Sequence, residues 1–354
     1  MNIPAGLSRL LDIELPIIQA PMAGSATPEL AAAVANAGGL GSLGVAMMKP
    51  AELHDAVTML RSLTNKPFNL NFFVHREPRL EDYDASPMQA ALAPHFAAFG
   101  LGDVPQPAVP APSFNADTLA LTLELAPPVV SFHFGMPEPA AVAALKQKGI
   151  KVLGCATTVA EAKRLESDGA DAIVAQGHEA GGHRGTFLDH VDLGTVGTMA
   201  LVPQVVDAVS VPVIAAGGIG DARGVAAAFM LGASGVQLGT AYLVCPEAGT
   251  SALYRRALSE VSDHATVVTK LFSGRPARAI HNRLTEELHA LEESAAPFPA
   301  QRAMVGPLIA ASAKENRAEY AQLWSGQAAR LSRVEPAAEK TARLMREAAA
   351  LLGG

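Results

Sequence analysis

The side chains best suited to chemistry lie in one short glycine-rich segment, QGHEAGGHRG at 176–185. It places His178 and His183, which titrate near neutral pH, beside a glutamate and a phosphate-matching arginine. Its glycines let the backbone pass close to a ligand. The segment follows the apolar run 171–175, which is typical of a buried strand. α/β enzymes present reactive groups on such loops, so we interpret 176–185 as part of an active site rather than a solvated surface loop.

Two further segments have the composition of phosphate-binding loops. Gly217 and Gly218 come directly after an apolar run and before a helical pattern, where free N–H groups bind anions. The next apolar run ends in 237–240, QLGT, which adds a glycine and a hydroxyl. Barrel enzymes often hold a phosphate with the loops after strands seven and eight. No GxGxxG follows the first strand, so a Rossmann dinucleotide site is not expected.

The elements that position these loops alternate regularly along the chain. Short apolar runs predict strands, and the alanine-rich stretches between them predict helices. This alternation predicts a (β/α)₈ TIM barrel, whereas an open doubly wound sheet remains an alternative because alternation does not show closure. The predicted strands are 16–20, 40–45, 68–73, 129–134, 151–156, 172–176, 213–216 and 235–238, and the predicted helices are 28–37, 49–63, 138–148, 158–168, 198–209 and 221–232.

Two regions interrupt the alternation. Residues 76–113, rich in proline and alanine, predict an insertion after strand three, and 251–354 predict a mostly helical segment that covers the active site and closes the barrel. The barrel itself would then be 1–75 and 114–250. Within the last segment, 337–352 is predicted to be a solvated amphipathic helix without a chemical role.

The bulk composition favours a soluble, intracellular protein of enzyme size. With 49% hydrophobic and 17% charged residues, the 354-residue chain can fill a large core. A net charge of −7 argues against nucleic acid or an anionic membrane as partner. Two cysteines favour a reducing cytoplasm over a disulfide framework, and neither a signal peptide nor a membrane-spanning run is expected.

Other polar residues lie within or at the ends of predicted strands. Asn69 and Asn71 alternate along strand three, so both should point into the barrel. His133 interrupts the apolar end of strand four and is either a core residue or a ligand-binding residue. Cys155 has no basic neighbour in sequence, which favours a buried thiol over a nucleophile.

Taken together, these segments resemble the nitronate monooxygenase family (2-nitropropane dioxygenase-like), class I. The resemblance runs from PIIQAPM at 16–22 through SFHFG at 131–135 and GHEAGGHRG to AAGG at 215–218 and QLGT, and ends at LWSGQ, 323–327. It implies a barrel that binds FMN, with no metal, as a monomer or homodimer. It also implies His183 as the catalytic residue and His133 near the substrate. The implied cofactor-binding residues are Ala20, Met22, Asn69, Gln176, Gly181, Gly217, Gly218, Gln237, Leu238, Gly239, Thr240, Ser325 and Gln327.

The chemistry implied by the resemblance is oxidation of alkyl nitronates, such as propionate 3-nitronate, by O₂ to a carbonyl compound and nitrite via a flavin semiquinone. One departure concerns the substrate pocket. Relatives often carry tyrosine and lysine where this chain has Phe298, Gln301 and Arg302. Two other functions fit the same segments: an NAD(P)H-dependent quinone or enoyl-thioester reductase with FMN, and a non-catalytic flavin-binding barrel.

Overall fold

The chain forms a closed barrel of eight parallel strands. In the computed structural model, which describes residues 5–188 and 194–353, the strands form one sheet in the order β1-β9-β8-β6-β5-β4-β3-β2. The two edges of this sheet meet because Leu40, next to β2, makes a parallel bridge with Ile18 of β1. Closure confirms the predicted barrel and excludes the open sheet. The strands are β1 (Ile17–Gln19), β2 (Gly41–Gly44), β3 (Phe68–Phe73), β4 (Val129–His133), β5 (Lys151–Ala156), β6 (Ala172–Gln176), β8 (Val213–Ala216) and β9 (Gly235–Leu238).

Three short parts of the predicted segments fall outside the described residues. Residues 1–4 and 189–193 belong to the predicted barrel ranges 1–75 and 114–250, and residue 354 belongs to the predicted C-terminal segment.

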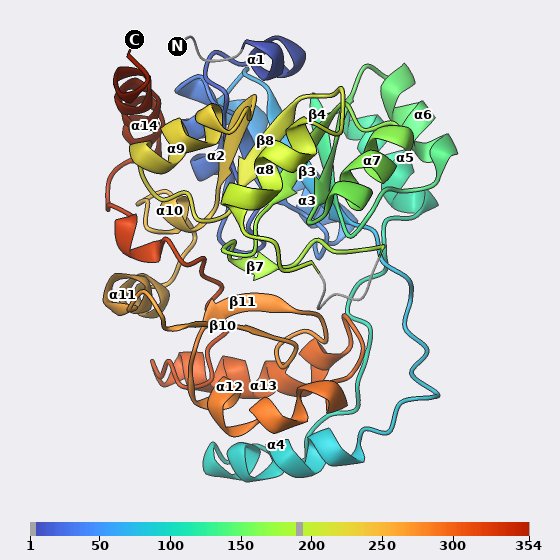
Figure 1. Cartoon of the computed structure of the whole chain (residues 1–354). Coiled ribbons are helices and arrows are strands. Elements are labelled where there is room, and N and C mark those ends of the chain that lie inside the picture. The colour runs from blue at the N-terminus through green and yellow to red at the C-terminus, as the bar shows by residue number, and fades with distance from the viewer. Residues whose placement is uncertain (1–4, 189–193, 354) are drawn as a thin grey trace.

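Helices surround the barrel (Figure 1). Several begin where the sequence supplies a cap: the side chains of Thr27, Asn115 and Thr158 each accept a hydrogen bond from a backbone N–H in the first turn. The helix that begins after Asn115 was not predicted. It fills the place between β3 and β4. The helices of this layer are α2 (Pro28–Asn36), α3 (Pro50–Leu63), α5 (Ala116–Leu125), α6 (Pro139–Gln147), α7 (Val159–Ser167), α8 (Thr198–Val206) and α9 (Ala222–Met230).

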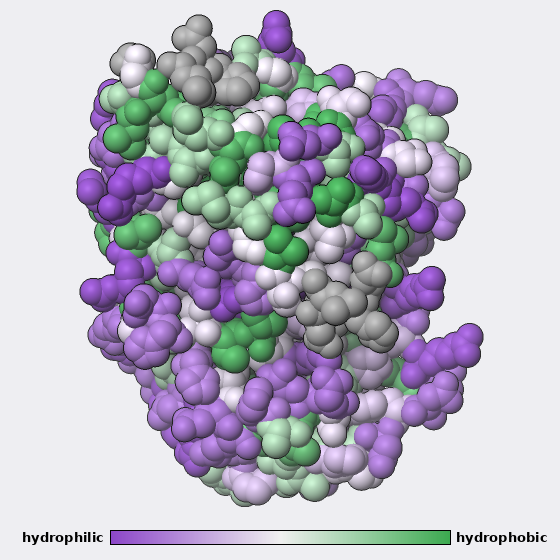
Figure 2. Space-filling view, in the orientation of Figure 1, coloured by the Kyte–Doolittle hydropathy of each residue, from purple (hydrophilic) through white to green (hydrophobic). Residues whose placement is uncertain are grey.

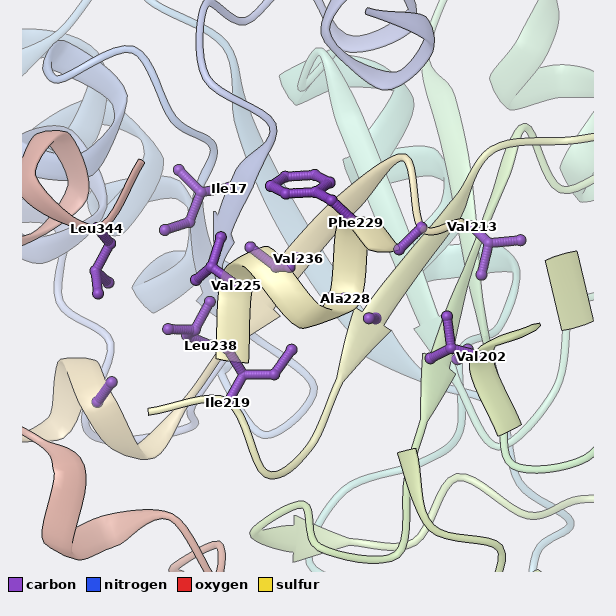
Figure 3. Packing of buried hydrophobic residues seen from close by; sticks show 14 of the residues in the cluster. Ile17, Val202, Val213, Ile219, Val225, Ala228, Phe229, Val236, Leu238 and Leu344 are labelled. Atoms are coloured by element: carbon purple, nitrogen blue, oxygen red, sulfur yellow. The ribbon is translucent and has the colours of Figure 1, made fainter. Parts of the chain in front are cut away.

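The last helix, α14 (Ala337–Leu351), completes the layer. It packs against α2 and α9, and it buries Leu344 in the same hydrophobic cluster as Ile17 and Val225 (Figure 3). The expectation of a helix that is merely solvated was therefore wrong for this face. The amphipathic pattern was read correctly, but sequence alone did not show what the apolar face would meet.

The barrel is closed at its N-terminal end by α1 (Gly6–Leu11). Leu7 and Leu11 of this helix join Ile18, Leu153 and Ile214 in one buried cluster in the barrel interior. These apolar side chains fill the lower part of the barrel. The space available to a ligand is therefore at the opposite end, at the carboxyl ends of the strands, where barrel enzymes bind substrates.

A second compact unit, here called the cap, lies beyond the carboxyl ends of the strands (Figure 1). It consists of residues 80–104 and 266–324, whose apolar side chains share a hydrophobic core. Two distant segments thus fold together, and the insertion after strand three packs on the C-terminal region instead of on the barrel helices. The cap elements are α4 (Ser86–Ala98), β10 (Thr266–Thr269), β11 (Ala277–Ile280), α12 (Arg283–Glu287), the 3₁₀ helix η1 (His289–Ser294) and α13 (Gln301–Lys314).

The described part of 251–354 is therefore not one helical cover. It contains a two-stranded hairpin, β10–β11, and its last helix, α14, lies in the outer layer of the barrel. Short elements link the two units. They are α10 (Thr240–Leu243), α11 (Ala252–Glu260) and η2 (Ala329–Leu331).

The glycine-rich segment 176–185 connects the barrel to the cap. Its residues Gly182–His183 form a short strand, β7, that pairs antiparallel with β11, with His183 opposite Ala277. The segment therefore belongs to the small sheet β10-β11-β7 as well as to the barrel loop.

The outer surface of the cap is largely hydrophilic on the face shown in Figure 2, which agrees with its apolar residues being directed inward. In the described part of the chain, no helix has the length and apolar character needed to cross a membrane.

Candidate active site

A cavity of about 680 Å³ lies between the carboxyl ends of the strands and the cap. Its volume is in the range of roughly 300–1,000 Å³ that is typical of small-molecule and cofactor sites. Most of the residues singled out from the sequence line it. These are Ala20, Met22, His133, Gln176, Gly181, His183, Gly217, Gly218, Gln237, Gly239 and Thr240.

Four of the residues assigned to the cofactor do not line this cavity. The Leu238 side chain points out of the barrel into the helix-facing cluster (Figure 3). Ser325 is fully buried, and Gln327 is exposed. Asn69 lies deeper in the barrel, where its Nδ2 donates to Ser42 Oγ at 3.1 Å and to Ser131 Oγ at 2.9 Å.

Its neighbour in the alternation, Asn71, does line the cavity. Both asparagines point inward as predicted, and Asn71 Nδ2 donates to Ser131 Oγ at 2.9 Å. Asn71 is one residue pair nearer the carboxyl end of β3, which places it at the cavity while Asn69 supports it from below.

The loop after β8 forms a cradle of backbone N–H groups. Gly217 and Gly218 have φ values of +106° and +70°, a left-handed conformation that favours glycine. Their amides and that of Gly239 make no hydrogen bond within the described part of the chain. Free amides at successive left-handed residues form a concave site for an anion. We call Gly217, Gly218 and Gly239 the glycine cradle.

Glu179 holds this cradle in place. Its carboxylate accepts hydrogen bonds from Thr198 N at 2.9 and 3.0 Å and from Thr198 Oγ, and Thr198 Oγ is also 2.9 Å from Gly217 O. The carboxylate is thus engaged in fixing two loops.

Arg184 does not serve as a phosphate ligand. Its guanidinium is buried and donates to the carbonyl oxygens of Gly177, Gln176 and Gly194, at 2.6, 3.1 and 2.8 Å. The interpretation of this arginine as a phosphate-matching group was wrong, because the loop's own carbonyls use its donors.

The Gln176 side chain also makes hydrogen bonds to the loop that follows it. Its Nε2 donates to His183 O at 2.9 Å, and its Oε1 accepts from Gly185 N at 2.9 Å. His133 Nε2 lies 3.1 Å from the same oxygen, His183 O. Both side chains line the cavity, and together they fix the position of His183.

His183 lies in a shell of aromatic rings. The centroid of its ring is 6.0 Å from Phe73, 5.8 Å from Phe134, 5.4 Å from Phe298 and 5.2 Å from Trp324. This shell excludes water from all but the cavity side of the imidazole.

The surroundings keep His183 uncharged. Burial, followed by the positive charges of His133, Arg275 and Arg302, lowers the pKa of His183 to about 3. Burial likewise lowers the pKa of His133 to about 4. Both rings are therefore neutral near pH 7, which leaves hydrogen bonding as the role of His183.

Ser273 determines which nitrogen of His183 carries the proton. The Ser273 hydroxyl is 2.9 Å from His183 Nε2 and 3.2 Å from Arg275 O. A hydroxyl has one proton. If that proton goes to Arg275 O, Ser273 Oγ accepts from the ring's Nε2–H, whereas if it goes to Nε2 the ring proton is on Nδ1. Nδ1 has no protein partner among the described residues, so it offers a ligand in the cavity an acceptor in the first case and a donor in the second.

The cap contributes several lining residues that sequence reasoning missed: Ser273, Trp324 and Gln322 line the cavity, as does Tyr254 of α11. Ser273, Gln322 and Tyr254 lie in no motif singled out from the sequence, whereas Trp324 belongs to LWSGQ, 323–327. Ser273, Gln322 and Trp324 reach the site because 266–324 fold over the strand ends, and Tyr254 comes from α11. The structure also places the three residues at which this chain departs from its relatives. Phe298 and Arg302 line the cavity, whereas Gln301 is buried and binds Ala296 N and Leu271 O at 2.9 and 3.1 Å.

The expectation about Cys155 can be checked directly. Cys155 is buried, and burial raises the pKa of its thiol to about 12, which confirms that it is not an activated nucleophile. In the described part of the chain, no three His, Cys, Asp or Glu side chains are grouped so that they could hold a metal ion.

Comparisons with known proteins agree with this geometry. The chain matches the nitronate monooxygenase family over residues 5–347. A probable nitronate monooxygenase from Staphylococcus saprophyticus is 41% identical over 333 residues, covering 94% of both chains. One from Staphylococcus aureus is 43% identical over 334 residues, covering 94% of this chain and 93% of the relative.

Two solved structures have the same overall fold. A nitroalkane oxidase from Streptomyces ansochromogenes superposes with a TM-score of 0.89 at 37% identity, covering 98% of this chain and 99% of the other. FabK from Thermotoga maritima superposes with a TM-score of 0.76 at 31% identity, covering 98% and 96%. With the family match and the full-length relatives, these findings show that the chain belongs to the nitronate monooxygenase family and is an oxidoreductase.

Proposed function

We propose that this enzyme uses bound FMN to oxidise alkyl nitronates, such as propionate 3-nitronate, with O₂ to a carbonyl compound and nitrite. The observation that carries the proposal is that one cavity joins the glycine cradle to a neutral, ring-enclosed His183. The family to which the chain belongs and the nitroalkane oxidase of the same fold support the choice of substrate.

The residues at the cavity fit a flavin mononucleotide. The glycine cradle offers free amides for a phosphate. The side-chain amide of Gln237 lines the cavity without a hydrogen-bond partner in the described part of the chain, and so offers both a donor and an acceptor to a flavin ring or ribityl chain.

The other assigned residues divide by position. Ala20 and Met22 would pack against the cofactor, and Gly181 and Thr240 would flank it. Leu238, Ser325 and Gln327 would contribute through the backbone that precedes or follows a lining residue. Asn69 would act by supporting Asn71.

Bound FMN would supply the electron acceptor for the anionic nitronate, with O₂ as the final oxidant. The protein's own residues orient and shield the substrate. In the tautomer in which Ser273 donates to Nε2, the Nδ1–H of neutral His183 would donate to a nitronate oxygen. The surrounding rings exclude water, which strengthens that hydrogen bond.

The low pKa of His183 also indicates the form of the substrate. A base with a pKa of about 3 is poorly matched to removing a carbon-bound proton near neutral pH. We therefore expect the enzyme to use nitronate anions that are already formed in preference to neutral nitroalkanes.

An absorbance spectrum and a nitrite assay test this function. We expect flavin bands in the purified protein, FMN as the cofactor released on denaturation, and nitrite formation from propionate 3-nitronate under air. A protein that shows no flavin, even after reconstitution with FMN, would exclude the proposal.

An FMN-dependent NAD(P)H reductase of quinones or enoyl thioesters is the second candidate, favoured by the FabK structures of the same fold. Anaerobic addition of NADH or NADPH separates the two. Rapid bleaching of the flavin bands, together with no nitrite from the nitronate, would move the assignment to the reductase.

A further inference from the structure

We propose that Arg302 binds a carboxylate at the far end of the substrate and so makes the enzyme selective for nitronates that carry a second negative charge. This inference rests on the proposed nitronate oxidation and identifies the residue that would choose among nitronates.

The charge of the cavity lining supports this role. Among the described residues that line the cavity, Arg302 is the only lysine or arginine, and Glu179 is the only aspartate or glutamate. The Glu179 carboxylate is occupied by Thr198 N and Oγ, so it does not neutralise the arginine. A carboxylated ligand would therefore meet one uncompensated positive charge.

Most N–H donors of the Arg302 guanidinium make no hydrogen bond to the described residues. Arg302 Nη1 donates to Gln322 Oε1 at 2.7 Å, and no carboxylate of the described residues lies within ion-pair distance of it. A guanidinium has five N–H donors in a planar fork that matches a carboxylate. The contact with Gln322 thus fixes one edge of the side chain and leaves the other donors for a ligand.

The backbone beneath Arg302 is held firmly. The preceding residue, Gln301, is buried and links Ala296 N to Leu271 O through its side-chain amide. These contacts tie the start of α13 to the end of the β10 strand region. Arg302 is therefore presented to the cavity from a fixed helix end.

The cavity wall next to His183 is aromatic. Phe298 and Trp324 both line the cavity and both contact the His183 ring, at centroid distances of 5.4 and 5.2 Å. The positive charge of Arg302 is also close enough to lower the pKa of His183. The proposed substrate has a nitronate at one end, a short hydrocarbon linker and a carboxylate at the other end. These parts would match His183, the aromatic rings and Arg302, respectively.

The test compares two nitronates of equal carbon number, propionate 3-nitronate and propyl 1-nitronate, in the FMN-loaded enzyme. The measured quantity is the ratio of their kcat/KM values, the carboxylate preference. Arg302 is exposed to solvent as well as to the cavity. We expect Arg302→Gln to lower this ratio about tenfold, because a charge-assisted contact at an exposed site is lost. Arg302→Lys, which keeps the charge without the fork, should lower it about threefold.

Two controls separate binding of the carboxylate from general damage. Arg346→Gln removes an exposed arginine of α14, on the barrel's outer layer, and should leave the preference unchanged. Added NaCl should reduce the preference of the unmodified enzyme and have little effect on that of Arg302→Gln, because screening acts only where the charge is present.

The inference is overturned if Arg302→Gln lowers both kcat/KM values equally, or if the unmodified enzyme shows no preference. If the unmodified enzyme oxidises neither nitronate, the proposed function fails instead. Calorimetric titration then decides the role of Arg302: binding of 3-nitropropionate should weaken about tenfold in Arg302→Gln, and unchanged binding would exclude the contact.

Discussion

The two sides of the cavity are built in different ways. The side proposed to bind FMN, here called the cofactor side, consists of loops that directly follow strands β6, β8 and β9. Its main feature is a set of glycine amides without a hydrogen bond among the described residues, two of them at positive φ. The side proposed to bind the nitronate, here called the substrate side, consists of side chains from the cap, among them Ser273, Phe298 and Arg302. The first side depends on local conformation and the second on how distant segments pack. Changes on each side should therefore affect different measurements.

The largest expected effect comes from His183, where the two sides meet. His183→Asn should lower turnover of the nitronate by about 10²–10⁴-fold, the usual range for a positioned hydrogen-bonding or proton-transferring group. FMN content should stay the same, because the cradle is untouched. Stopped-flow turnover and the flavin absorbance at fixed protein concentration measure both quantities. His54→Asn, at an exposed position of α3, is the control. Loss of FMN together with turnover would show that the two sides are not separable.

The second prediction concerns acid stability of the ring-enclosed histidines. In the unfolded chain, His183 and His133 take up protons below about pH 6.5, whereas in the fold their pKa values are about 3 and 4. The free energy of unfolding should therefore be fully retained above pH 6.5 and fall as the pH drops from there towards 4. The slope should reach at most about 1.4 kcal/mol per pH unit for each histidine.

Urea denaturation at a series of pH values measures this slope. His183→Asn should make it shallower, and His54→Asn should not. A slope that is the same in His183→Asn as in the unmodified protein would contradict the burial of a neutral imidazole at this position.

On the cofactor side, Gly218→Ala should weaken FMN binding by about tenfold. A Cβ at φ +70° costs about 1–2 kcal/mol, and it would lie 3.4 Å from Glu179 Cβ. Fluorescence titration with FMN measures the dissociation constant. Gly102→Ala is a matched control, since Gly102 has no positive φ and no atom within 4 Å of the added Cβ. Equal FMN affinity in the two variants would argue against a cradle that requires left-handed residues.

The smallest effect is expected at Ser273, which acts only through His183. Ser273→Ala should lower kcat/KM about threefold to tenfold, because losing one hydrogen bond frees the choice of tautomer. Ser273→Thr keeps the hydroxyl and should restore most of the activity. Steady-state nitrite release measures both. If the alanine variant is as active as the enzyme with Ser273, the hydroxyl does not set the proton position on His183.

Much of the cofactor side could be predicted from the sequence. The barrel strands appear as apolar runs, and the glycine loops appear at their ends, because strand and turn conformations depend mainly on neighbouring residues. Here Gly217, Gly218 and His183 were placed correctly at one cavity. The helix at 116–125 was missed, since a proline- and alanine-rich insertion precedes it and obscures the alternation.

The sequence by itself determined the alternation of strands and helices, the left-handed glycine loops and the histidine in the loop after β6. Only the tertiary structure decided which donors remain free. Arg184 bears the same guanidinium as Arg302, yet the first is used by the carbonyls of its own loop and the second faces the cavity. The tertiary structure also decided that the cap forms from 80–104 and 266–324. Residues so distant along the chain meet only when a shared apolar core brings them together.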